Sequence, residues 1–346
     1  MTSGVGDRPW LQGTDQPLAV VHDVALLDLD GVVYVGPEPV DGAADALARA
    51  RAQGMRLAFV TNNASRSPDD VARHLVELGI PATTDDVVTS AQAAAAVIVA
   101  EVGTGASVLV TGSPALRQVV EAAGLRAVSS ADDRPDAVVQ GFWSELCYAD
   151  LAEAALAVRA GAFWVATNAD STLPSSRGLL PGNGSLVGVV RAAAGKNPVV
   201  AGKPELPLHA EGVRRMAAEN PLVVGDRLDT DIEGAHRANT SSLLVLTGVT
   251  TASDLLTARP EHRPTFLGEG LAALLEAQPA VVLDDDGSAR CGEAIVHSRG
   301  GQLMIDGDDA PGIEALRALL ALVWSMDDAG QRYEGAPKLL ADLGWH

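Results

Sequence analysis

The stretch LLDLDGVVY, residues 26–34, places two carboxylates at the end of an apolar run. Such a run predicts a buried strand, and acids that follow it lie at the carboxyl edge of a parallel sheet, where open α/β folds bind ligands. Asp28 and Asp30 are two residues apart, so their side chains point to the same side of an extended chain. Gly31 allows a tight turn afterwards. The stretch therefore predicts a ligand site with two acids at a sheet edge.

Short β-branched segments alternate with alanine-rich segments from residue 25 to residue 248. This alternation predicts βαβ units, in which a parallel sheet carries helices on both faces. One helix has clear end signals, because Ser67 and Pro68 suit its first positions and Gly79 suits its end. We therefore expect an α/β fold with a doubly wound parallel sheet. The expected strands are 25–29, 56–61, 107–112, 136–142, 162–168, 198–202, 221–226 and 242–248, and the expected helices are 42–54, 67–79, 114–123 and 149–160.

The last part of the chain, residues 277–346, has a different pattern. It indicates antiparallel strands joined by turns and then an amphipathic helix over 312–326. A segment of about 70 residues holds a small core but is marginally stable alone. We therefore interpret it as a small α+β module that packs on the rest of the chain or on another subunit, giving a homo-oligomer. The apolar stripe of its helix is formed by Leu316, Leu319, Leu320 and Val323.

Composition excludes several classes of protein. The formal net charge of −20 repels nucleic acids and anionic membrane surfaces, so we expect neither as a partner. The cysteines, Cys147 and Cys291, are far apart and lack metal-ligand spacing, which argues against a disulfide scaffold or a zinc site. The N-terminus lacks the features of a signal peptide, and the apolar run at 91–100 is too short to span a bilayer. We expect a cytoplasmic protein.

Polar side chains follow other expected strands as well. Because the carboxyl ends of parallel strands meet at one sheet edge, these side chains should converge with the two acids of the first strand. Hydroxyl, amide and ammonium groups suit phosphate oxygens, and carboxylates suit a hard metal ion. The residues are Thr61, Asn62 and Asn63 in VTNN, Lys203 in GKPE, and Asp226 and Asp231 in VGDRLDTD.

The order of these motifs, DxDG, TNN, GKP and GDxxxTD, resembles the four motifs of haloacid dehalogenase-type phosphohydrolases over residues 23–276. Within that superfamily the chain is similar to the NagD-like phosphatases. The similarity extends through TSAQAA (89–94), ATNAD (166–170) and PGNGSLVG (181–188). Trp143 departs from the pattern, because these enzymes often have an acid after the glycine-phenylalanine pair.

The resemblance implies a domain organisation. It places a Rossmann-like core in two parts, 23–85 and 199–276, with an α/β cap domain inserted as residues 86–198. An N-terminal tail, 1–22, precedes the core, and the α+β module, 277–346, follows it.

The resemblance also implies roles for the acids. Asp28 would attack phosphorus and form an aspartyl-phosphate, and Asp30 would protonate the leaving alkoxide and later activate water. Mg²⁺ would be the cofactor, held by the carboxylates of Asp28 and Asp226 and by the backbone carbonyl of Asp30. Asp231 would hold a metal-bound water.

The remaining motif residues would bind a small phosphomonoester. Thr61, Asn62 and Lys203 would hold the oxygens of the transferred phosphoryl group, with Asn63 supporting them. In the cap, Asn168, Asp170 and the loop 172–182 would line the pocket for the leaving group. The similarity leans toward glycerol 3-phosphate as the substrate, with phosphoglycolate or another sugar or cofactor phosphate as alternatives.

Three other functions differ from this one in what they require of the sequence. A dehalogenase has no need of an acid at the position of Asp30. A phosphomutase of the superfamily usually carries a helical cap between the first two motifs, and here Thr61 follows Asp30 too closely for such an insertion. A non-catalytic scaffold that kept the fold stays open, because fold alone does not fix function.

Overall fold

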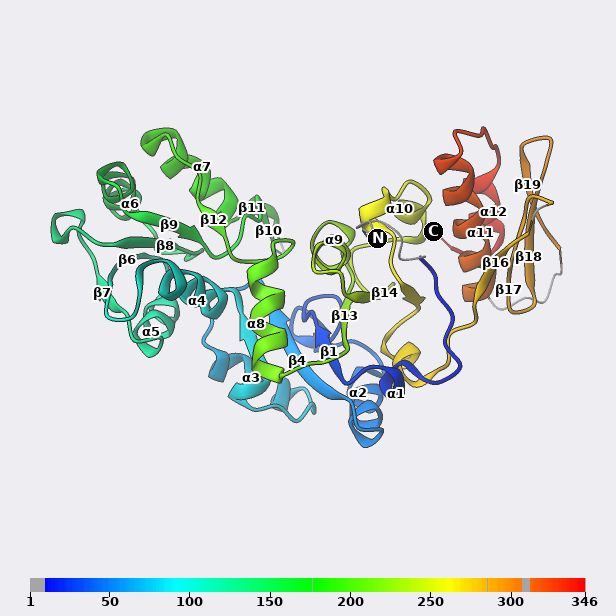
Figure 1. Ribbon diagram of the computed structural model, residues 1–346, viewed down its shortest axis with the longest axis horizontal. Helices are drawn as coiled ribbons and strands as arrows, with labels where there is room; N and C mark the ends of the chain where they lie inside the picture. The colour runs from blue at the N-terminus through cyan, green and yellow to red at the C-terminus, as the bar shows by residue number, and fades with distance from the viewer. Residues whose placement is uncertain (1–9, 176, 285, 307–311, 346) are drawn as a thin grey trace, which may run out of the picture. The chain divides into compact units, whose positions relative to one another are not determined.

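The computed structural model describes residues 10–175, 177–284, 286–306 and 312–345 (Figure 1). The chain divides into two compact units. The first consists of Met1–Leu57 and Ala218–His346, and the second consists of Ala58–Ala217.

The first unit contains a parallel sheet with the strand order β15-β14-β13-β1. Its central strands are apolar and buried, because helices or other segments cover both faces. Leu27 of β1 lies beside Val224 of β13, so the two strands end together and the acids that follow share one edge. The α/β fold with a parallel sheet is thus confirmed. The strands are β1 (Val24–Leu27), β13 (Pro221–Gly225), β14 (Ser241–Val245) and β15 (Phe266–Gly268).

Short elements surround this sheet. A π-helical turn, Leu228–Ile232, leads directly into α9, and it carries the second acid of the motif that follows β13. The other elements are α1 (Leu18–Val21), α2 (Ala43–Ala52), α9 (Glu233–Arg237), α10 (Ala252–Leu256), the hairpin strands β2 (Tyr34–Val35) and β3 (Glu38–Pro39), and 3₁₀ turns at Pro260–His262 and Leu271–Leu275.

The C-terminal module belongs to the first unit. Four antiparallel strands, in the order β16-β17-β18-β19, precede the long helix α11, as the sequence predicted, and β16, β17 and β18 pack on that helix. The predicted apolar stripe of α11 is buried, but so are its other sides, including Arg317 and Trp324. The reason is that α11 also packs on α10 and β15 of the same unit. The elements are β16 (Val281–Leu283), β17 (Ser288–Cys291), β18 (Ala294–Arg299), β19 (Gln302–Asp306), α11 (Gly312–Asp328) and α12 (Ala336–Asp342).

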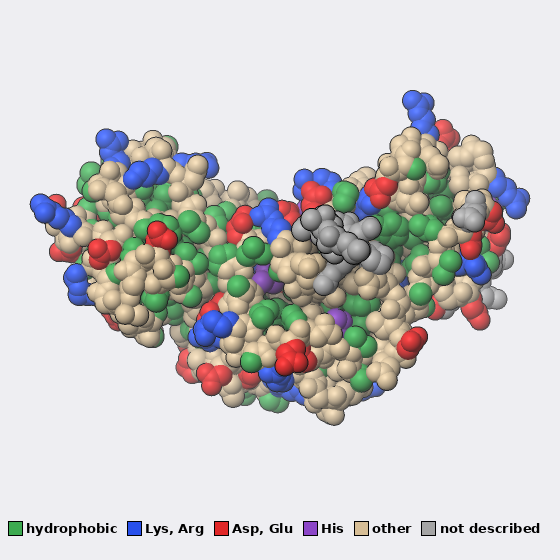
Figure 2. Space-filling view, in the orientation of Figure 1, with side chains coloured by type: hydrophobic (Ala, Val, Ile, Leu, Met, Phe, Trp, Pro, Cys, Tyr) green, Lys and Arg blue, Asp and Glu red, His purple; other side chains and the backbone are tan. Residues whose placement is uncertain are grey.

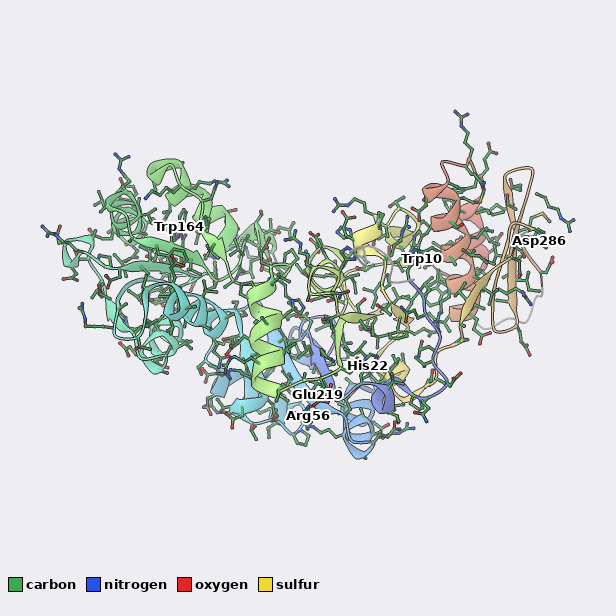
Figure 3. The ribbon with its side chains drawn as sticks, in the orientation of Figure 1. Trp10, His22, Arg56, Trp164, Glu219 and Asp286 are labelled. Carbon is green, nitrogen blue, oxygen red and sulfur yellow. The ribbon has the colours of Figure 1, made fainter. Side chains whose placement is uncertain are left out.

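Buried arginines join the module to the rest of the first unit. Arg317 donates to the side chain of Gln278 (3.0 Å) and to the carbonyl oxygen of Gln12 (2.9 Å), and burial lowers the pKa of its guanidinium. Arg263 lies over the rings of Trp10 and Trp324 (Figure 3 labels Trp10). Part of the segment predicted to be an N-terminal tail therefore takes part in this core, while residues 1–9 lie outside the described residues.

The second unit contains a five-stranded parallel sheet with the order β12-β9-β8-β6-β7. In this unit β4 also pairs with β5 in parallel. The predicted strand 198–202 shortens to two residues in β12. The predicted cap boundaries, 86–198, stay a prediction. The strands are β4 (Arg56–Thr61), β5 (Val87–Thr89), β6 (Ser107–Thr111), β7 (Arg126–Val128), β8 (Ala137–Gln140), β9 (Phe163–Ala166) and β12 (Val199–Val200).

Helices cover both faces of the five-stranded sheet, with α4 and α5 on one face and α6 and α7 on the other (Figure 1). Ser67 caps α3 by accepting a bond from the main chain of Asp70, and Pro68 takes the first helical position, as predicted. The predicted loop 172–182 contains a hairpin of β10 and β11, and residue 176 at its tip lies outside the described residues. The elements are α3 (Pro68–Glu77), α4 (Ser90–Val102), α5 (Pro114–Ala122), α6 (Tyr148–Ala160), α7 (Asn183–Ala194), α8 (Leu206–Met216), β10 (Thr172–Ser175), β11 (Gly178–Pro181) and 3₁₀ turns at Thr84–Asp86 and Ala131–Asp133.

Within the described ranges, every helix is too short or too polar to cross a membrane. On the face drawn in Figure 2, the Lys and Arg side chains of the described residues lie scattered among Asp and Glu. An anionic ligand therefore meets no broad positive surface on this face and depends on local groups.

Candidate active site

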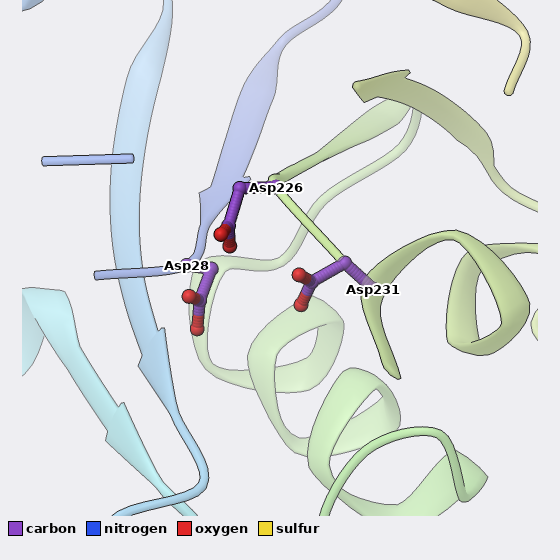
Figure 4. Close-up of side chains that lie close together, drawn as sticks. All are labelled: Asp28, Asp226 and Asp231. Atoms are coloured by element: carbon purple, nitrogen blue, oxygen red, sulfur yellow. The ribbon is translucent and has the colours of Figure 1, made fainter. Parts of the chain in front are cut away.

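Three carboxylates gather in the first unit (Figure 4). One oxygen from each of Asp28, Asp226 and Asp231 lies within 4.8 Å of the others. Asp28 follows β1, Asp226 follows β13, and Asp231 lies in the π-helical turn. Asp226 and Asp231 are at most 1% exposed. Buried carboxylates so close together repel one another unless a cation or protons compensate their charge, and an oxygen-only set suits a hard divalent ion.

Glycines allow the chain to approach Asp226 closely. A Cβ atom at Gly31 or at Gly248 would overlap the Asp226 carboxylate. Gly31 also has a φ of +87°, which fits the tight turn that the sequence predicted. The main-chain N–H of Val249 donates to Asp226 Oδ2 (2.7 Å), and the hydroxyl of Thr247 donates to the carbonyl oxygen of Gly31 (2.6 Å). Backbone packing therefore fixes this acid.

Asp231 is held in the same way. A Cβ atom at Gly225 would overlap its side chain, and the N–H of Arg227 donates to Asp231 Oδ2 (3.2 Å). These contacts hold its carboxylate in the three-acid cluster. Asp30, by contrast, is exposed and lies outside that cluster. A ligand or water can reach its exposed carboxylate.

In the second unit, Asn62 is the centre of a hydrogen-bond network. Its Oδ1 accepts the main-chain N–H of Lys203 (2.8 Å), and its Nδ2 donates to the carbonyl oxygen of Lys203 (3.2 Å). The same Nδ2 lies 3.4 Å from Asp170 Oδ2. The side chain of Asn168 donates to the Asn62 carbonyl oxygen (2.8 Å). Four residues predicted for the site are therefore brought together, although more than a hundred residues separate Asn62 from the others.

The other two residues of the TNN motif stabilise their own turn. Thr61 is buried, and its hydroxyl accepts the main-chain N–H of Asn63 (3.1 Å). Asn63 Oδ1 accepts bonds from the N–H and the hydroxyl of Ser65 (2.8 and 2.7 Å). Asn63 therefore shapes the loop.

Sequence reasoning missed several supporting residues. Ser90, at the start of α4, is fully buried and donates to the Asn62 carbonyl oxygen (2.7 Å). Gly202 has no room for a Cβ atom, which would overlap Asn62 Oδ1. The sequence signal for Ser90 was its place in TSAQAA. Gly248 follows a strand as Gly202 does, but a glycine after a strand is too common to stand out.

Comparison with known proteins identifies the class. Residues 25–126 match the model of the haloacid dehalogenase-like hydrolases, and residues 200–274 match a second model described as HAD-hydrolase-like. The chain belongs to the haloacid dehalogenase-like hydrolases and is a phosphatase, which confirms the resemblance that the motifs suggested.

Individual relatives narrow the position within the family. The chain is 49% identical over 319 residues to the D-glycerol 3-phosphate phosphatase of Mycobacterium tuberculosis, covering 89% of this chain and 87% of the relative. A crystal structure of the M. tuberculosis glycerol phosphate phosphatase in complex with magnesium superposes with a TM-score of 0.82 at 48% identity, covering 90% of this chain and 92% of that one. A p-nitrophenyl phosphatase from Archaeoglobus fulgidus gives a TM-score of 0.68 at 28% identity, covering 73% and 98%.

Proposed function

We propose that the protein hydrolyses glycerol 3-phosphate to glycerol and phosphate with the help of Mg²⁺. The observation that carries the proposal is the cluster of Asp28, Asp226 and Asp231 in a chain that is 49% identical to a D-glycerol 3-phosphate phosphatase. The match covers 89% of this chain, which is more than the core and cap domains alone.

The acid cluster fits Mg²⁺. All the groups it offers are carboxylate oxygens, two of its residues are buried, and its oxygens lie within 4.8 Å of one another. Asp28 and Asp226 are the proposed direct ligands, together with the backbone carbonyl of Asp30, and Asp231 supports them through water. When bound, Mg²⁺ offsets the repulsion between an attacking carboxylate and a phosphate dianion.

Asp28 and Asp30 divide the chemistry. A carboxylate oxygen of Asp28 attacks phosphorus while the bond from phosphorus to the glycerol oxygen breaks. Asp30 gives its proton to that oxygen, so neutral glycerol leaves. Asp30 then takes a proton from water, which attacks phosphorus and releases phosphate from Asp28. The exposure of Asp30 supports this role, because the acid has to reach both the leaving group and water.

The second unit supplies groups for the phosphoryl oxygens. We assign this role to the hydroxyl of Thr61, the main-chain N–H of Asn62 and the ammonium of Lys203. The side-chain amide of Asn62 is engaged by the main chain of Lys203, so it positions Lys203 instead of binding phosphate. Asn168 and Asp170 are proposed to border the leaving group.

We also propose that the protein forms a homo-oligomer and that it is cytoplasmic. The apolar stripe of α11 is buried within its own chain, so an oligomer would have to use other surfaces.

A substrate screen tests the proposal. Phosphate release from glycerol 3-phosphate, phosphoglycolate, sugar phosphates and p-nitrophenyl phosphate would be compared by kcat/KM, with and without Mg²⁺. We expect glycerol 3-phosphate to rank first and chelation to abolish turnover. If phosphoglycolate gave a higher kcat/KM than glycerol 3-phosphate, phosphoglycolate would be the preferred substrate instead. No release from any ester would favour a scaffold that kept the fold.

A further inference from the structure

A cavity of about 340 Å³ lies wholly within the second unit, at the carboxyl end of its five-stranded sheet. Its walls come from the end of β6, the start of α5, the loop after β8 and the first turns of α6. Its volume is near the lower end of the range of about 300–1,000 Å³ that is typical of small-molecule sites. None of the residues proposed for catalysis lines it.

The topology of the sheet makes this position distinctive. From β6 the chain continues through α5 to β7 on one side, whereas from β8 it continues through α6 to β9 on the other side. The strands β6 and β8 are neighbours, and the helices that follow them, α5 and α6, lie on opposite faces of the sheet (Figure 1). Open parallel sheets bind ligands in the crevice at such a switch point.

Opposite charges enter the cavity from the two faces. Arg117 comes from α5, and Asp150 and Glu153 come from α6. Among the described residues, no ion pair joins this guanidinium to either carboxylate. A cavity that holds both signs without pairing them offers complementary groups to a ligand that carries both.

Among the described residues, each of these three charged groups has one polar atom that is hydrogen-bonded to the protein and at least one that is not. Nη2 of Arg117 donates to the hydroxyl of Ser129 (2.9 Å), and Oε2 of Glu153 accepts the N–H of Ala131 (2.6 Å). In the same way, Oδ2 of Asp150 accepts a main-chain N–H at the start of α6 (2.9 Å). These bonds hold the side chains in place, while the second oxygen of each acid and Nη1 of the arginine have no hydrogen bond within the part of the chain that the structure describes.

Thr111 lies at the floor of the cavity. Thr111 is 1% exposed, and its Oγ1 has no hydrogen-bond partner among the described residues. It shares a sheet face with Leu109, which packs against α6, so its side chain lies on the side of the two acids. Trp143 and Leu146 add apolar wall. Protein atoms enclose Oγ1 of Thr111, so this part of the floor offers a ligand no polar contact.

We propose that this cavity binds a small zwitterion of the amino-acid class. The ligand carboxylate would meet Arg117, its ammonium group would meet Asp150 and Glu153, and its carbon chain would lie against Trp143. The site is separate from the proposed catalytic residues, so binding there does not depend on the phosphatase proposal.

A binding experiment on the full chain tests this inference. The unfolding temperature and calorimetric heats would be measured with each of the common amino acids. Each amino acid would be compared with its decarboxylated amine and with its deaminated acid. We expect at least one amino acid to bind saturably and to raise the unfolding temperature, because a ligand that binds only the folded state stabilises it. The matching amine and acid, each lacking one charge, should bind at least tenfold more weakly.

Variants assign any binding to the cavity. Arg117→Gln and Glu153→Gln should each weaken it at least tenfold, and the matched exposed changes Arg191→Gln and Glu121→Gln should leave it unchanged. Thr111→Val, which keeps the side-chain shape and changes only an enclosed atom, should leave it unchanged. Three results would overturn the proposal: no amino acid binds, binding survives both cavity variants, or glycerol 3-phosphate is the only compound that binds. Circular dichroism of each variant checks that it is folded.

Discussion

The two units hold their reactive groups by different means. In the first unit, Asp226 and Asp231 lie against glycines whose missing side chains leave just enough room for the carboxylates. In the second unit, hydrogen bonds from the side chain of Asn62 hold the main chain of Lys203. The first arrangement fails abruptly when an atom is added, because backbone cannot give way easily. The second should fail gradually as bonds are removed.

The largest effect should follow the addition of one methyl group in the first unit. In Gly248→Ala the new Cβ would overlap the Asp226 carboxylate and displace it. We expect the Mg²⁺ concentration for half-maximal activity to rise by about 10- to 100-fold, as for other changes that misplace metal ligands. A Mg²⁺ titration of activity measures it. Gly188→Ala is the matched control, since its Cβ would meet open space. If Gly248→Ala had the same Mg²⁺ titration as wild type, steric packing would not explain how Asp226 is positioned.

A smaller effect should follow the loss of hydrogen bonds in the second unit. Asn62→Ala removes both side-chain bonds to Lys203, and we expect kcat/KM to fall by about 5- to 30-fold, which corresponds to about 1–2 kcal/mol. Asn62→Asp keeps the acceptor for the Lys203 N–H, but it turns the donor into a carboxylate oxygen beside the Lys203 carbonyl and the Asp170 carboxylate, so it should be impaired at least as much as Asn62→Ala. If Asn62→Asp kept the kcat/KM of wild type, the clamp on Lys203 would not explain the loss in Asn62→Ala.

The smallest effect concerns pH and the start of β1. Partial burial raises the pKa of Asp23, but hydrogen bonds from the N–H groups of Glu219 and Asn220 and the guanidinium of Arg56 lower it by more. The pKa of Asp23 in the folded protein is therefore below its usual value of 3.8 (Figure 3 labels Arg56 and Glu219). A lowered pKa stabilises the fold above the unfolded-state value, and this contribution disappears as pH falls through the folded-state value. We expect Asp23→Ala to cost about 1–2 kcal/mol at pH 7.

Urea unfolding at several pH values measures that cost. The difference between wild type and Asp23→Ala should be constant above pH 3.8 and should shrink below it. Asp136 is a comparable acid in the second unit, where the N–H and hydroxyl of Ser107 lower its pKa. Asp136→Ala should show the same pH dependence. A difference that stayed constant to low pH would contradict the linkage.

Sequence reasoning located the groups at the ends of β1, β4 and β13, because strand periodicity and strand ends are local properties. It could not assign the side chain of Asn62, whose partner Lys203 is far away in sequence and whose bonds depend on tertiary packing. The helix α11 was predicted as one-sided for a similar reason. Its sequence shows an apolar stripe, but only the fold reveals that α10 and β15 cover further sides of the helix.

The hairpin of β10 and β11 illustrates another limit. Its residues are exposed and include proline and glycine, so the segment carries turn signals without the alternation that marks a strand. The cavity at the end of β6 was likewise beyond reach, because the order of strands in the sheet has to be known before a switch point can be located. Trp143, which departs from the family pattern, lines that cavity.

The proposed mechanism requires Asp28 to carry the phosphoryl group during turnover. Acid quenching of the Mg²⁺-loaded protein with glycerol 3-phosphate labelled in phosphorus, followed by digestion and mass spectrometry, tests it directly. We expect the label on the peptide that contains Asp28, sensitive to hydroxylamine as an acyl phosphate is, and absent from Asp28→Asn. Turnover by Asp28→Asn within tenfold of wild type, or a label on another residue, would contradict the account.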